Sequence, residues 1–146
     1  MKRLKGIGAS EGIAIGRAEL LTPRVVVVDR WVSRELVRDE IERFEAAVDA
    51  TDRQLKHLSR QLEVQKLHDG HLLIEAHRLM LRSHDLSGAS RSLIGKEALA
   101  AEPAVRRVVD GILAKFDKMT DPYLRERGGD VEAVGERLLS ALLGLP

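Results

Sequence analysis

The sequence predicts a mainly α fold: an antiparallel helical bundle of two helical hairpins, with a short Gly-rich β segment at its N-terminus. Aromatic residues make up only 3% of the 146 residues, whereas Leu, Val, Ala, Arg and Glu are abundant, and this composition favours helices over sheets. After residue 33, apolar residues recur every three or four positions, which is the spacing of one helix face. The hydrophobic fraction of 44% indicates a globular chain with a packed core.

The first 24 residues differ from the remainder. The run LKGIGASEGIAIGRAELL at 4–21 contains four glycines, and short apolar runs divided by glycine are typical of strands joined by tight turns. The run VVVVDRW at 25–31 predicts another short extended piece. A sheet that would cover these strands is not evident in the sequence. We therefore expect residues 1–24 to be the N-terminal strand segment of an absent, incomplete α/β domain, and residues 25–146 to form the helical domain.

A long amphipathic helix is predicted from Ser33, which is a suitable N-cap, to about residue 62. Its apolar stripe consists of Val37, Ile41, Phe44, Val48, Leu55, Leu58 and Leu62, with Thr51 in the one gap. Acid-to-base pairs four residues apart are expected on its outer faces: Asp39–Arg43, Asp49–Arg53 and Asp52–Lys56. Each pair contributes only about 0.2–0.5 kcal/mol, so packing must supply most of the stability.

Shorter helices follow. Gly70 is expected to interrupt or end the first helical region. We then expect one helix with Leu73, Ala76 and Met80 on a face, a short one over 84–95, and a long one marked by Val105, Val108, Ile112, Phe116 and Met119. Asp121 and Pro122 predict the N-cap and first position of a final helix with Leu124, Val131, Val134, Leu138 and Leu142, and with Gly144 as its C-terminal cap. Gly128-Gly129 marks a weak point or a close helix contact within it.

Several classes of function are disfavoured by composition. A formal net charge of +1 gives no electrostatic case for nucleic-acid binding. The absence of cysteine excludes disulfide and thiol chemistry. The sequence shows neither an apolar run of about 18 residues, as a spanning helix needs, nor the apolar core of a secretion signal. We therefore expect a cytoplasmic protein that binds neither nucleic acid nor membrane.

Three stretches carry a family resemblance. They are GIGASEGIAIGRAELL at 6–21, EAHRLMLRSHDL at 75–86 and DPYLRERGGDVEAVGERLLSALLG at 121–144. In this order they resemble the N-terminal region of Enzyme I, the phosphoenolpyruvate-protein phosphotransferase of the bacterial sugar phosphotransferase system. The nitrogen-related regulatory paralogues share this region.

The resemblance implies a fold and a reaction. In this family a helical subdomain binds the phosphocarrier HPr, and an α/β subdomain carries the phosphorylated histidine. The enzyme transfers the phosphoryl group of phosphoenolpyruvate, with magnesium, to that histidine and then to HPr. The family's Gly-Gly-x-x-(Ser/Thr)-His setting does not occur in this sequence. We therefore expect a fragment that binds HPr, lacks the phosphoacceptor histidine, needs no cofactor and is inactive alone. The full-length enzyme, which requires magnesium, is expected to be a homodimer through its C-terminal domain.

Four of the five histidines lie in the stretch HDGHLLIEAHRLMLRSHD at 68–85. A metal site is one reading, because His71 shares a helix face with Glu75 and with His68. However, zinc needs three or four ligands, and no Cys or second ligand pair completes the set. A phosphohistidine needs a cradle of donors, for which Gly70 alone is a weak basis. Neither a metal site nor a phosphorylated histidine is therefore expected.

The favoured reading is a docking surface. Carried over from the family, the HPr-facing residues would be His68, Asp69, Leu73, His77, Leu79, Met80, Ser83, His84, Asp85, Leu86, Phe116, Leu124 and Arg127. This surface departs from the acidic cluster usual in the family, since only Asp69 and Asp85 remain. Core packing is the competing interpretation of Leu73, Met80 and Phe116. Arg127 could instead pair with a carboxylate of its own helix, from Glu126 or Asp130.

Two other functions compete. The regular apolar stripe of the first helix also suits a self-associating bundle without a role in phosphotransfer. The Gly-rich start contains G-x-G, but no complete G-x-G-x-x-G, so a nucleotide-binding enzyme has little support.

Overall fold

The computed structural model describes residues 11–13, 15–16 and 25–145. The predicted Gly-rich strands lie mostly outside these residues, and the described residues 11–13, 15 and 16 form no strand. Residues 34–143 are mainly helical, as predicted. Within the described ranges, no helix combines the length and the apolar character that crossing a membrane requires.

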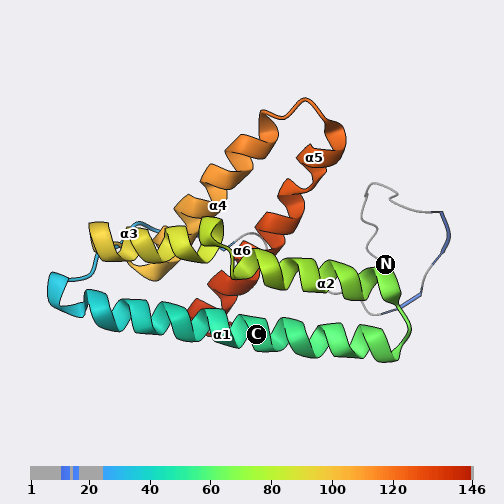
Figure 1. The fold of residues 1–146 in the computed structure, drawn as a ribbon, viewed down its shortest axis with the longest axis horizontal. Helices are drawn as coiled ribbons and strands as arrows, with labels where there is room; N and C mark the ends of the chain where they lie inside the picture. The colour runs from blue at the N-terminus through green and yellow to red at the C-terminus, as the bar shows by residue number, and fades with distance from the viewer. Residues whose placement is uncertain (1–10, 14, 17–24, 146) are drawn as a thin grey trace, which may run out of the picture.

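Two helical hairpins form the bundle (Figure 1). In the first, α1 (Val37–Val64) packs antiparallel to α2 (His68–Leu81). In the second, α4 (Ala101–Asp117) lies beside α6 (Gly128–Leu143), and α6 also packs across α1. This arrangement confirms the predicted fold class.

Shorter elements connect the hairpins. The 3-10 turn η1 (Arg34–Leu36) precedes α1, and the π-helical turn η2 (His84–Gly88) leads into α3 (Ala89–Glu97). The short α5 (Pro122–Glu126) lies at the tip of the second hairpin (Figure 1). The Asp121 carboxylate accepts the Tyr123 N–H at 2.8 Å, so the predicted N-cap is confirmed.

The core lies where the two hairpins meet. Phe44, Val48 and Leu55 of the predicted stripe are buried, and Thr51 fills the gap while its hydroxyl donates to the Ala47 carbonyl at 2.8 Å. The other large buried side chains come from α2, η2, α3, α4, α6 and the residues before α4: Leu81, Leu86, Ile94, Leu99, Val105, Val109, Val134, Leu138 and Leu139. The periodicity in the sequence therefore identified the buried face of α1 correctly. The face expected for α2 was wrong, because Leu73 is exposed and Ile74, His77 and Leu81 are buried instead.

The prediction that Gly70 ends the first helical region is wrong. The chain turns at Lys66, which has the left-handed φ of 58°, and Leu67 N–H donates to the Leu62 carbonyl at 2.9 Å. Gly70 instead lies in the first turn of α2, where a Cβ would be 3.4 Å from Cδ1 of Leu62. Its small size therefore suits the close approach of the two helices.

The final helix is divided in two. The segment predicted as one helix from Pro122 breaks at Arg127, between α5 and α6. Gly128 is buried, and a Cβ there would lie 3.3 Å from Cδ2 of Leu113 in α4. The close-contact interpretation of this glycine is thus confirmed. Gly144 ends α6 with φ 65°, as predicted.

Three members of the acid-base pairs expected along α1 bind other partners: Arg43, Asp49 and Asp52. Arg43 binds Glu40 at 2.7 Å and Glu102 of α4 at 2.9 Å. Asp52 binds Arg78 of α2, and Asp49 and Asp52 both bind Arg82, the residue that follows α2. These acids lie on sides of α1 that face other helices, so tertiary partners replace the local ones.

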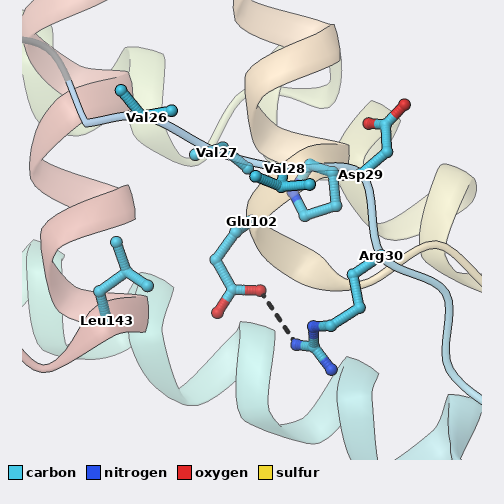
Figure 2. A pocket seen from close by; sticks show the side chains of 8 residues that line it. Val26, Val27, Val28, Asp29, Arg30, Glu102 and Leu143 are labelled. Carbon is cyan, nitrogen blue, oxygen red and sulfur yellow. Dashed lines mark hydrogen bonds and ion pairs between the residues drawn. The ribbon is translucent and has the colours of Figure 1, made fainter.

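The segment 25–31 is extended, as predicted, and runs past the start of α4 and the end of α6 (Figure 2). Trp31 forms an isolated antiparallel bridge with Leu99, in which Ala100 N–H donates to the Arg30 carbonyl at 2.8 Å. Val27 packs against the core, whereas the neighbouring valines are exposed.

Candidate docking surface

The residues predicted to face a partner come from four elements: α2, η2, the end of α4 and α5 with the residue that follows it. Most of them are exposed, and Leu79 exposes 77% of its surface. The exposed members are His68, Asp69, Leu73, Leu79, His84, Asp85, Leu124 and Arg127. Three leucines in this set thus leave apolar surface uncovered on α2 and α5.

Two predicted contacts are corrected by burial. Leu86 is only 2% exposed and belongs to the core, and His77 is 7% exposed. His77 lies three residues after Ile74 and four before Leu81, so all three share the buried face of α2. A partner that docks on this structure therefore cannot touch either side chain directly.

Three other predicted residues have divided roles. Met80 and Phe116 are partly buried and pack against the core, so the core interpretation holds for much of their surface. The Ser83 hydroxyl accepts the Leu86 N–H at 3.2 Å and caps η2. These side chains therefore support the surface more than they extend from it.

Sequence reasoning missed two exposed apolar residues of the same surface. Leu72 lies seven residues before Leu79, or two helical turns, so the two project from one side of α2. Tyr123 is exposed beside Leu124 in α5. The seven-residue spacing was a usable signal for Leu72, and a tyrosine beside an arginine is a usual pairing at interfaces.

Arg127 is held by two neighbours. Its guanidinium lies 3.2 Å from Asp130 Oδ2 and also donates to the Tyr123 hydroxyl, with its carbon 4.9 Å from the centroid of the tyrosine ring. The Tyr123 and Asp130 contacts raise the pKa of Arg127. The pairing with Asp130, which was the alternative to the docking interpretation, is thus present, and the side chain still exposes 44% of its surface.

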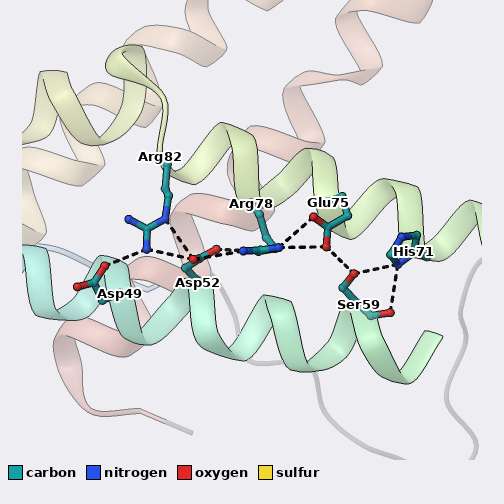
Figure 3. A network of polar contacts seen from close by, with 7 residues as sticks. All are labelled: Asp49, Asp52, Ser59, His71, Glu75, Arg78 and Arg82. Atoms are coloured by element: carbon teal, nitrogen blue, oxygen red, sulfur yellow. Dashed lines mark hydrogen bonds and ion pairs between the residues drawn. The ribbon is translucent and has the colours of Figure 1, made fainter. Parts of the chain in front are cut away.

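A polar network fixes α2 on α1 behind this surface (Figure 3). Asp52 accepts from Arg78 at 2.8 Å and from Arg82 at 3.0 Å, and Asp49 accepts from Arg82 at 2.9 Å. The hydrogen bonds from Arg78 and Arg82 lower the pKa of Asp52. Because both arginines bridge to α1, the exposed face of α2 is presented on a rigid base.

His71 and Glu75, the pair considered for a metal, also belong to this network (Figure 3). The Ser59 hydroxyl donates to Glu75 at 2.6 Å, so His71 Nδ1, at 2.9 Å, must donate to the serine oxygen. This serine bond, followed by that from Arg78, lowers the pKa of Glu75. In the described part of the chain, no three potential metal ligands gather.

A hollow of about 450 Å³ lies on another part of the molecule (Figure 2). It runs between the extended segment 26–30, the start of α4 and the end of α6, and Arg30 lies 3.5 Å from Glu102 inside it. None of the residues predicted to face a partner lines this hollow. The exposed leucines of the candidate surface therefore lie apart from this hollow.

Comparison with known proteins gives the chain a family. The family described as PEP-utilising enzyme, N-terminal, matches residues 5–127. Phosphoenolpyruvate-protein phosphotransferases are 33% identical over 144 residues in Listeria monocytogenes and 35% identical over 144 residues in Cupriavidus necator, covering 99% and 98% of this chain. The chain spans only 25% of the length of each relative.

The fold has a solved counterpart as well. An NMR solution structure of the Enzyme I (nEIt) protein superposes with a TM-score of 0.76 at 24% identity, over 84% of this chain and 49% of that one. The described helices thus match part of a longer solved chain, and the sequence match extends over most of the same residues. On this evidence the chain belongs to the family of PEP-utilising enzyme N-terminal domains.

Proposed function

We propose that this chain is the docking module of a phosphoenolpyruvate-protein phosphotransferase, Enzyme I, and that it binds the phosphocarrier HPr for phosphoryl transfer. The observation that carries the proposal is the exposure of apolar side chains on two elements: Leu72, Leu73 and Leu79 on α2, and Tyr123 and Leu124 on α5, where the Arg127 cation contacts Tyr123. Apolar contacts beside an arginine are typical of protein interfaces. The names of the relatives support the same activity.

The chemistry is proposed to lie elsewhere in the enzyme. The Gly-Gly-x-x-(Ser/Thr)-His setting of the phosphoacceptor is not found in this sequence, so the module would receive a partner without exchanging phosphate itself. Magnesium would serve the phosphoenolpyruvate reaction of the full enzyme. A cytoplasmic location and dimerisation outside this region remain predictions.

The charge of the surface bears on the partner. Asp69 and Asp85 are the only acids among the residues carried over from the family, and Arg127 contributes a cation. With little net charge to attract a basic partner, association should be slower and less selective than on an acidic surface. We expect binding in the micromolar range or weaker, as is usual for small transient interfaces.

Titration of isotope-labelled cognate HPr with the chain tests the proposal. The wild-type chain should shift HPr amide signals, and Leu79→Asp should weaken binding by about tenfold or more, since an apolar contact becomes a buried charge. The matched control is Leu36→Asp, because Leu36 is also exposed but lies in η1. An absence of shifts at millimolar chain would reject docking.

The same samples address the alternatives. A sedimentation experiment should find a monomer that forms a complex with HPr. An obligate dimer that ignores HPr would instead identify a self-associating bundle. Parallel titrations with the carrier of the sugar phosphotransferase system and with the nitrogen-related carrier would distinguish a transport enzyme from its regulatory paralogue. The carrier that binds more tightly identifies the system.

A further inference from the structure

A chain of four polar side chains leads from the core to the proposed docking surface. His77 Nε2 lies 3.4 Å from Oδ1 of Asp130, across the contact between α2 and α6. The other carboxylate oxygen of Asp130 lies 3.2 Å from Arg127, which in turn donates to the Tyr123 hydroxyl. Asp130 therefore joins a buried histidine to an exposed arginine.

Exposure rises steadily along this chain. The side chain of His77 is 8% exposed, that of Asp130 is 23% exposed and that of Arg127 is 44% exposed. An exposed Arg127–Asp130 pair would be only weakly ordered by itself, because two long or mobile side chains lose entropy when they pair. Anchoring Asp130 on a buried ring removes part of that freedom before Arg127 is bound.

The histidine has this one polar attachment among the described residues. A carboxylate only accepts hydrogen bonds, so Nε2 carries the proton shared with Asp130. The other ring nitrogen, Nδ1, is buried and has no hydrogen-bond partner in the described part of the chain. A residue selected only to fill this space would not need a polar ring, since burying an unpaired polar atom has a free-energy cost.

We propose that His77 is a positioning residue: it anchors Asp130, which with Tyr123 holds Arg127 in the orientation that the partner meets. This inference rests on the proposed function for the identity of the partner, whereas the positioning of Arg127 is a property of the free chain. It also gives His77 a role in docking that its burial would otherwise exclude.

The test compares two variants by NMR of the Arg127 Nε–Hε group in the free 146-residue chain. His77→Leu fills the space but cannot donate, whereas the amide of His77→Gln can still donate to Asp130. We expect His77→Leu to shift the Arg127 signal and lower its order parameter, and His77→Gln to restore both. His71→Leu is the matched control, because His71 is another histidine of α2 whose hydrogen bond leads to Ser59 of α1 and not to Asp130.

The second measurement is affinity for HPr. His77→Leu should weaken HPr binding by about three- to tenfold, because the side chain of Arg127 must then be ordered when the partner binds. The loss of affinity should not exceed that of Arg127→Ala. An Arg127 signal unchanged in folded His77→Leu would overturn the inference. If that variant fails to fold, His77→Asn, whose amide is too short to reach Asp130, replaces it with the same criterion. If wild type binds no HPr, the proposed function fails while the NMR comparison still decides the positioning.

Discussion

Replacing Gly135 with alanine should destabilise the contact between α4 and α6. A Cβ at this position would lie 2.6 Å from Cγ2 and 3.4 Å from Cγ1 of Val109, which is 1% exposed. A β-branched side chain in a packed core has little freedom to rotate away. Overpacking of this kind costs about 1–3 kcal/mol, and the better helix propensity of alanine offsets up to about 1 kcal/mol of it.

Gly111 provides the matched control. It lies inside α4, and no atom lies within 4 Å of a Cβ built there. Gly111→Ala should therefore stabilise the protein by about 0.5–1 kcal/mol through helix propensity alone. The same substitution thus has opposite expected signs at two helical positions of one hairpin.

Thermal unfolding followed by circular dichroism measures the difference. A gap of about 1–3 kcal/mol between the two variants corresponds to roughly 3–10 °C in Tm for a chain of this size. In a double-mutant cycle, Val109→Ala should reduce the cost of Gly135→Ala, since it removes the methyl groups that clash. Gly135→Ala that proves as stable as Gly111→Ala would refute the packing argument.

Two further predictions concern buried carboxylates. Hydrogen bonds from arginine lower the pKa of Asp52, so its contribution to the free energy of unfolding is present above the ordinary Asp pKa of about 4 and is lost as the pH falls through the lowered pKa. Asp52→Asn should therefore cost about 1.5–3 kcal/mol at pH 7 and reduce the loss of stability at acidic pH, measured by urea unfolding at a series of pH values. A loss of stability at acidic pH equal to that of the wild type would contradict this. Glu40 accepts the Ala101 N–H at 2.7 Å, so Glu40→Ala should cost about 1–3 kcal/mol and speed exchange of that amide, whereas Glu40→Gln, which retains an acceptor, should cost less.

The sequence predicted the long helices α1, α4 and α6 well because each of them buries a regular apolar stripe. The burial of Phe44, Val48 and Leu55 follows directly from spacing. It predicted ion pairs poorly, because a local pair competes with partners from other helices that spacing does not reveal. The turn at Lys66 was missed for a related reason: tertiary packing placed a residue other than glycine in the left-handed conformation.

The residues of the candidate site were predicted through family resemblance, and some of them are buried in the structure. Resemblance assigned His77 and Leu86 to the surface, although Ile74, His77 and Leu81 already had the spacing of a buried face. Conversely, Leu72 has the spacing of the exposed face and was left out. Helical phase, which depends only on the spacing of residues in the sequence, therefore corrects a set of residues transferred by motif.

The polar network between α1 and α2 also determines the register of the first hairpin. Apolar stripes of similar leucines tolerate a slip by one helical turn, whereas charges do not. A slip by one turn that brought Glu75 to the position of Arg78 would place its carboxylate beside Asp52, which now accepts from Arg78 at 2.8 Å, so two carboxylates would face each other. The acids and arginines thus favour this alignment of the two helices, and with it the height at which each exposed leucine of α2 is presented.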